Sequence, residues 1–264
     1  MSNDKTLKSK QKKFLLGMIG IFVFLGVWQL AGTLGLVSTK ILASPTKVIA
    51  TFFDKFTNPK PDGATLLEHL WVSLRLALIG FGAACVIGIP LGLTMGFFKG
   101  MDYFFNPIFE IIRPIPPLAW IPVILLILGI GTSAKAFIIF VAAFVPCLLN
   151  SYVGIKRTRT TLINVARTSG ASNAQIFFKV GIPSAIPMIF TGVKVSLGTS
   201  WATLVAAELL SSSVGLGYMI QRGRTLVRSD IIIVGMLTIG VVGAFLAFLL
   251  SLLEKKIAPW RNKK

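Results

Sequence analysis

Charged residues are scarce in this 264-residue chain, and acidic residues are the scarcest of them. Charged side chains make up 14% of the sequence, with 9 Asp and Glu against 27 Lys and Arg, whereas hydrophobic residues reach 54%. This balance excludes a soluble globular domain and predicts a protein that crosses a membrane several times. The basic excess does not indicate nucleic-acid binding, because Lys and Arg gather at the ends of apolar runs and form no basic face interleaved with aromatic residues.

Groups that carry chemistry are also few. The two cysteines, Cys85 and Cys147, lie in apolar runs, so we expect two buried small hydrophobes without disulfide or metal-site spacing. The single histidine, His69, has no metal-ligand pattern around it and is expected at a membrane interface. The sequence has no glycine-rich loop that ends in Lys-Ser or Lys-Thr and no nucleophile–base set. We therefore expect no catalytic residue, no bound metal and no cofactor.

Six apolar runs are long enough to cross a hydrocarbon core of roughly 30 Å at about 1.5 Å per residue. Prolines interrupt the middle runs, which membrane helices tolerate where neighbouring helices or a cavity satisfy the freed carbonyl groups. The first run follows five lysines but is too long for a signal peptide, so we interpret it as a retained span. The sequence predicts an all-α polytopic protein with one transmembrane domain, residues 14–253, and spans at about 14–37, 70–98, 104–131, 134–153, 186–210 and 231–253.

The basic residues indicate the orientation of the spans. With six spans, sixteen Lys and Arg fall on the side that holds both termini and eight fall on the other side. Because basic loops stay in the cytoplasm, we expect cytoplasmic tails at 1–13 and 254–264 and a cytoplasmic loop at 154–185. Two external segments remain, 38–69 and 211–230.

Both external segments carry helical signals. Pro45 can start a short helix with an apolar face suited to the membrane interface, formed by Val48, Ile49, Phe52 and Phe53. Segment 211–230 is too polar to span the membrane and too apolar for a plain linker. We expect a short re-entrant or capping helix near Tyr218–Ile220.

The long cytoplasmic loop contains a polar, basic stretch, residues 164–183, in which Gly170 lies between two short helical runs. A loop that only reconnected two spans could be far shorter, so we expect a docking surface. Gly170 permits a tight turn between helices, and Pro183 is expected to end the second helix. Phe177 and Phe178 can offer an aromatic anchor to a groove. The alternative is an amphipathic connector that lies on the membrane surface.

A charge at the centre of a span costs at least ~2.5–3.5 kcal/mol on insertion scales, so each such charge should pair, reach the interface or face a water-filled path. The charges within or near the ends of spans are Arg75, Glu110, Arg113, Lys194 and Glu208. Lys194 is expected to extend to the cytoplasmic interface. Glu208 is expected to pair with an arginine of segment 211–230 or to hold a gate, and it is a poor ligand for an anion.

Arg113 begins a proline-rich stretch that cannot form a regular helix. Broken helices at mid-membrane depth commonly line a pathway, and an arginine there suits the oxygens of a sulfonate or nitrate. The alternative is an ion pair with Glu110, three residues earlier on the same helix. Further candidates for the pathway or its gate are Pro117, Trp120, Trp201, Thr203 and Glu208, although helix packing or a membrane interface explains both tryptophans equally well.

Several stretches resemble one family. The spacing from Asn164-Val165-Ala166 through Gly170 to Val180-Gly181-Ile182-Pro183 is similar to the EAA loop of bacterial ABC importer permeases. Four further stretches, 113–122, 171–177, 200–210 and 215–221, resemble the permease subunits for taurine, alkanesulfonates, and nitrate or bicarbonate, and the taurine permeases most of all. The resemblance extends from about residue 66 to the C-terminus. The chain departs from the family pattern at the start of the loop, where Asn164-Val165 replaces the usual Glu-Ala and the acidic residue is missing.

The resemblance implies a type I ABC importer permease in a bacterial inner membrane, a transport subunit that is not itself an enzyme. It implies ABC ATPase subunits on 164–183, an external solute-binding protein on the two external segments, membrane lipid, and a homodimer around one pathway. The implied substrate is taurine or an aliphatic sulfonate, with nitrate, bicarbonate or another small solute as the alternative. The implied ATPase contacts are Ala166, Arg167, Ser169, Gly170, Ala171, Gln175, Phe178, Ile182 and Pro183.

Two other classes remain open. A secondary transporter would need intramembrane carboxylates for ion coupling, and Glu110 and Glu208 are the available ones. A membrane-embedded enzyme would need a reactive cluster, which the sequence does not supply.

Overall fold

The computed structural model describes the backbone of residues 2–35, 38 and 41–257, and the side chains of these residues from 15 onward except that of Ser211. Every regular element in these ranges is helical. The end of the predicted tail 254–264, residues 258–264, lies outside the described residues. The chain divides into two compact units, residues 1–67 with 219–237 and residues 68–218 with 238–264.

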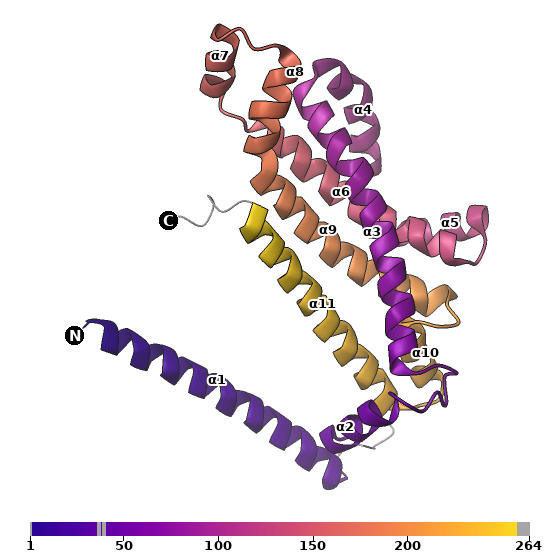
Figure 1. Cartoon of the computed structure of the whole chain (residues 1–264). Helices are drawn as coiled ribbons and strands as arrows, with labels where there is room; N and C mark the ends of the chain where they lie inside the picture. Colours follow the sequence, from indigo (N-terminus) through magenta and orange to yellow (C-terminus); the bar gives the residue numbers. More distant parts are fainter. Residues whose placement is uncertain (1, 36–37, 39–40, 258–264) are drawn as a thin grey trace. The chain divides into compact units, whose positions relative to one another are not determined.

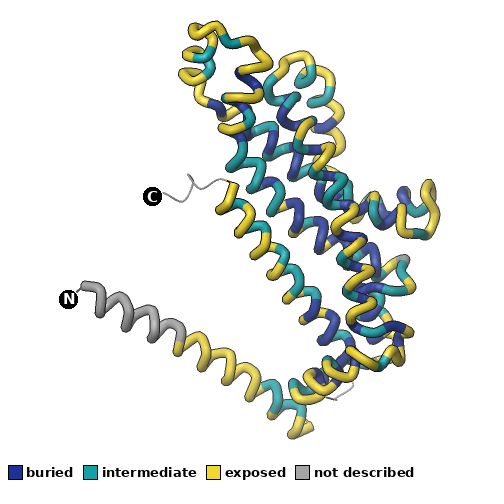
Figure 2. The backbone as a smooth tube through the Cα atoms, viewed as in Figure 1, coloured by how far each residue is buried: buried dark blue, intermediate teal, exposed yellow. Residues whose placement is uncertain are grey.

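The first unit contains α1 (Ser2–Thr33) and α2 (Pro45–Asp54), both visible in Figure 1. The apolar side chains of α1 from Leu15 onward are mostly exposed (Figure 2), which is unfavourable in water and suits a helix in lipid. Helix α2 begins at Pro45 as predicted, because proline fits the first helical turn, where its missing N–H has no partner to lose.

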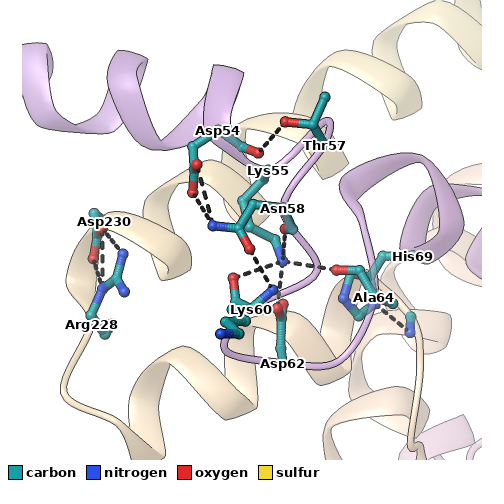
Figure 3. Close-up of polar contacts among 11 residues, drawn as sticks. Asp54, Lys55, Thr57, Asn58, Lys60, Asp62, Ala64, His69, Arg228 and Asp230 are labelled. Carbon is teal, nitrogen blue, oxygen red and sulfur yellow. Dashed lines mark hydrogen bonds and ion pairs between the residues drawn. The ribbon is translucent and has the colours of Figure 1, made fainter.

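The loop after α2 is built around the buried side chain of Lys55. Its ammonium group donates to the carbonyl oxygens of Ala64 (2.8 Å) and Asn58 (3.3 Å) and forms an ion pair with Asp62 (Figure 3). In the same unit, Asp230 accepts a hydrogen bond from Thr51 (2.9 Å) and pairs with Arg228 (2.6 Å). These contacts bind parts of both predicted external segments into one unit.

The second unit is built on α3 (Leu66–Phe97), α6 (Thr132–Lys156) and α9 (Ile182–Ser211), which run side by side in Figure 1. Helix α3 meets α6 through four glycines spaced by eight or four residues, Gly80, Gly88, Gly92 and Gly96. A Cβ atom at Gly80 would lie 2.7 Å from the Cβ atom of Ile139. At Gly88 the nearest atom of α6 would be 3.2 Å away. Small residues at this spacing let the two backbones approach closely, as in other membrane helices.

The third predicted span, 104–131, is not one helix. Helix α4 (Lys99–Ile112) is followed by a 3₁₀ turn (Pro117–Trp120) and α5 (Ile121–Leu128), with a bend of 84°. Three prolines between residues 113 and 118 remove the N–H groups that a continuous helix would need. By contrast, α3 and α6 continue through Pro90 and Pro146, in line with the tolerance of membrane helices for proline.

The remaining long helix, α11 (Ser229–Ile257), contributes to both units. Among the described residues, five helices are long and apolar enough to cross a membrane, or six if the bent pair is one span. The capping helix predicted near Tyr218–Ile220 is present as α10 (Leu216–Thr225).

Candidate functional site

The predicted docking segment, residues 164–183, contains the end of α7 (Thr160–Thr168), a turn and α8 (Asn173–Ile176). Gly170 has a φ of +82°, in the left-handed region that glycine adopts without strain. The N–H of Gly170 donates to the carbonyl of Arg167 (2.9 Å), and that of Ala171 donates to the carbonyl of Ala166 (3.0 Å). These two bonds form a Schellman motif, which explains why glycine stands at 170.

Helix α8 begins with a capping box. The hydroxyl of Ser172 accepts the Gln175 N–H (3.3 Å), and the Ser172 N–H donates to the Gln175 side chain (2.9 Å). The turn between α7 and α8 is therefore defined from both sides by local hydrogen bonds. The prediction of helical runs on both sides of Gly170 is confirmed, but only the first, α7, is a short separate helix.

A cavity of about 380 Å³ lies inside this helix–turn–helix segment. Five of the nine residues predicted to contact an ATPase line it, namely Ala166, Ser169, Gly170, Ala171 and Gln175. Arg167, Phe178 and Pro183 are exposed, and Ile182 packs against a buried cluster. A Cβ atom added at Gly170 would meet nothing within 4 Å, so the turn presents open space to an approaching surface.

Two details predicted for the docking segment are wrong. Phe177 is not an exposed anchor, because it is buried with its ring centroid 5.1 Å from that of Phe97; Phe178 alone is exposed. Pro183 does not end a helix, because α8 continues through a π turn (Phe177–Gly181) into α9. A π turn shifts the hydrogen-bond register by one residue, which lets a helix continue past a residue without an N–H.

The other end of α9 carries a buried polar cluster. Glu208 is 1% exposed and accepts hydrogen bonds from the Ser73 hydroxyl (2.7 Å) and the Gly217 N–H (2.8 Å). The Ser73 hydroxyl in turn accepts the Leu216 N–H (2.8 Å), and His69 Nδ1 accepts the Gly215 N–H (3.0 Å). We call this set of side chains and N–H groups the α10 cluster, because it caps the start of α10.

The α10 cluster corrects two predictions. His69 is fully buried rather than interfacial, since its ring satisfies a buried backbone N–H. Glu208 bonds to Ser73 and to backbone rather than to an arginine of segment 211–230. A gating role for Glu208 stays a prediction. The sequence analysis did not identify Ser73 as a functional residue. The one available signal was the charge of Glu208 inside a span, which requires a polar partner nearby.

The structure does not bring the predicted pathway residues together in one site. Arg113 pairs with Glu110 at 3.1 Å, and both side chains are about half exposed. Pro117 and Trp120 lie in the 3₁₀ turn, where Trp120 packs against Ile121, Ile124, Ala134, Ile138 and Ala207. Among the described residues, the indole nitrogen of Trp120 is buried without a hydrogen-bond partner.

The pathway candidates on α9 face other helices. Trp201 is buried and donates to the Ile239 carbonyl of α11 (3.0 Å), and Thr203 is buried as well. Lys194 forms an ion pair with Glu254 of α11, and its extension to the cytoplasmic interface stays a prediction. The sequence also gave no sign that Cys85 and Cys147 face each other, with 3.6 Å between their sulfur atoms.

Comparisons with known proteins agree on one family. Residues 88–263 match the model of the "binding-protein-dependent transport system inner membrane component" family. The chain is 34% identical to the taurine transport system permease protein TauC of Escherichia coli, over 97% of this chain and 92% of that protein. It is 32% identical to the putative aliphatic sulfonates transport permease protein SsuC of Bacillus subtilis, over 96% and 90%. It is 36% identical to the nitrate import permease protein NrtB of Synechocystis sp., over 93% and 90%.

A solved structure shares the fold. One chain of the MetNI methionine ABC transporter in an inward-facing conformation aligns with a TM-score of 0.65 at 22% identity, over 73% of this chain and 96% of that chain. The family model and the sequence matches lead to the same assignment. The chain belongs to the binding-protein-dependent transport system inner membrane components, the permease subunits of ABC importers.

Proposed function

We propose that this permease imports a small sulfonate, taurine first among them, as a homodimer driven by ATP hydrolysis on separate ATPase subunits. Relatives named for taurine and for aliphatic sulfonates support the substrate class. The half-exposed guanidinium group of Arg113 supports it as well, because its planar set of N–H donors suits sulfonate oxygens. Nitrate is the second candidate, since a nitrate import permease is a relative of similar identity.

The proposal that ATPase subunits dock here is supported by the geometry of the turn between α7 and α8. Its backbone is fixed by the Schellman motif and the capping box, and its small residues leave a cavity of about 380 Å³ beside Gly170. Phe178 is 66% exposed on the adjoining turn, where a groove on another protein could receive it. In this arrangement both termini and the docking segment are cytoplasmic.

The remaining partners follow from exposed surfaces. The apolar side chains of Leu126, Ile127 and Ile130 are 89%, 72% and 80% exposed at the bent third span, and a second copy of the chain would cover them beside the pathway. The external solute-binding protein would dock on 38–69 and 211–230. The bonds of Asp230 to Thr51 and Arg228 support this, because they join parts of both segments within one unit.

Gly170→Asp tests the docking. The substitution places a charged side chain in the open space beside the turn, so we expect the permease to insert in the membrane but to lose its ATPase during co-purification. Gly35→Asp is the matched control, because Gly35 also has a positive φ (+69°) and open space around its Cβ position. Co-purification of the Gly170 variant at the level of the control would refute docking at this turn.

Transport assays test the rest of the proposal. Vesicles that contain the permease, its ATPase and its binding protein should take up labelled taurine only with ATP inside, and unlabelled sulfonates should compete better than nitrate. Uptake that follows an ion gradient without ATP would instead support a secondary transporter.

A further inference from the structure

A second cavity lies beside the docking segment and is distinct from the one inside the turn. It has a volume of about 500 Å³ and is formed by the junction of α3 and α4, the end of α6, and α7. The polar side chains that line it are Lys99, Lys156, Thr158, Thr160, Arg167 and Asn173. Its volume falls within the roughly 300–1,000 Å³ of known small-ligand sites.

The charge of this cavity is positive and only partly balanced. Lys156 pairs with Asp102 at 2.9 Å and also bonds to the hydroxyl of Tyr152, so one of the three cations is neutralised inside the protein. Lys99 and Arg167 have no carboxylate partner in the part of the chain that the structure describes. Both side chains are exposed and free to bind an anion.

A buried hydroxyl group lines the same cavity. Thr158 is 7% exposed, and its Oγ1 atom has no hydrogen-bond partner among the described residues. A buried hydroxyl without a partner is unfavourable, which marks a place where a ligand oxygen would be stabilising. The rule that basic loops remain cytoplasmic explains lysines and arginines at this end of the protein, but it does not explain this hydroxyl.

Two helices also direct their N-termini to the cavity. Helix α4 has 14 residues and begins at Lys99, and α7 has nine residues and begins at Thr160; neither has a side-chain cap. Both of these first residues line the cavity. The first N–H groups of a helix have no partner within it and carry partial positive charge, so they favour an anion.

We propose that this cavity binds a phosphate group. Lys99 and Arg167 supply charge, Thr158 donates its hydroxyl, and the first N–H groups of α4 and α7 complete the coordination. The effect on transport rests on the docking proposed above: a bound phosphate would hold α7 against α4 and α6 and so regulate how the docking segment meets the ATPase. The phosphate could belong to a soluble anion or to the headgroup of an anionic phospholipid.

Thermal unfolding of the full chain tests the site. The chain, purified in an uncharged detergent, is titrated with sodium phosphate at constant ionic strength and, separately, reconstituted in nanodiscs of phosphatidylglycerol or of phosphatidylcholine. We expect phosphate or phosphatidylglycerol to raise the melting temperature of the wild type. In Thr158→Val and Lys99→Gln, the half-saturating phosphate concentration should rise about tenfold, because the first change removes a hydroxyl donor and the second removes a positive charge beside the anion.

Two further comparisons make the result decisive. Arg157→Gln is the matched control, because Arg157 is exposed on the same surface and does not line the cavity, and it should titrate like the wild type. Without ligand, Thr158→Val should melt no lower than the wild type, because it removes an unpaired buried hydroxyl. The proposal is refuted if neither probe raises the melting temperature, or if all four proteins respond alike.

The same experiment separates the two sources and the two proposals. Saturation by inorganic phosphate in detergent identifies a soluble anion, whereas stabilisation only in phosphatidylglycerol nanodiscs identifies a lipid headgroup; either result supports the site. Because the titration uses the permease alone, it decides the site even if Gly170→Asp keeps its ATPase and the docking proposal fails.

Discussion

Ser73→Ala should be among the most damaging conservative changes in the second unit. The Ser73 hydroxyl donates to Glu208 (2.7 Å) and accepts the Leu216 N–H (2.8 Å), and both partners are buried. Alanine leaves that N–H without its acceptor, at a cost of about 1–3 kcal/mol, and removes a bond worth about 1 kcal/mol. The free energy of unfolding should fall by about 2–4 kcal/mol, which corresponds to a melting temperature lower by roughly 4–16 °C.

Hydrogen exchange locates the damage. The amide protons of Gly215, Leu216 and Gly217 should exchange faster in Ser73→Ala, because their acceptors in the α10 cluster are lost or displaced. Ser200→Ala is the control: Ser200 is fully buried, but its hydroxyl donates only to the Leu197 carbonyl of its own helix (2.9 Å). If both serine variants lose the same stability and leave exchange at 215–217 unchanged, the α10 cluster does not hold this end of the fold.

Two further substitutions test the packing of each unit. Gly80→Ala should cost about 1–3 kcal/mol of unfolding free energy, because the new Cβ atom would lie 2.7 Å from a side chain of α6. The control Gly82→Ala has open space around its Cβ position and should be neutral or slightly stabilising. Equal thermal stability of the two variants would contradict the close contact between α3 and α6. Lys55→Met should lower the free energy of unfolding by about 3–5 kcal/mol, because the buried Asp62 loses its cation. The control Lys47→Met, at an exposed position, should change it by less than about 0.5 kcal/mol. Equal unfolding midpoints of the two variants would show that the Lys55 ion pair does not contribute to stability.

Local signals in the sequence predicted local structure well. Pro45 marked the start of α2, and Gly170 marked the turn between α7 and α8, because each residue type imposes its own backbone geometry. The all-α fold and the family were also confirmed, since hydropathy and motif spacing extend over most of the chain. The effect of prolines was predicted as well: three of them after Arg113 end a helix, whereas a single proline such as Pro90 fits inside a packed one.

Contacts between distant residues could not be predicted. Ser73 and Glu208 are 135 residues apart, and nothing near Ser73 distinguishes it from other serines inside apolar runs. Phe177 and Phe178 are neighbours of the same type, yet one is buried and the other exposed, because the π turn sets which of them faces Phe97. The pathway residues and the docking contacts remain predictions, since each would be completed by a second protein chain.

The helix that begins at Asn173 continues through the π turn and α9 to Leu210, a run of 38 residues. At a rise of about 1.5 Å per residue, this continuous helix is about 57 Å long. Its first turn belongs to the docking segment, and its last turns carry Glu208 of the α10 cluster. If the docking segment receives a push from a partner, an axial displacement would therefore reach the α10 cluster along one continuous helix, with the π turn as the one irregular point in its path. A movement at one end of this helix would then be coupled directly to the other end, without a series of separate conformational changes between them.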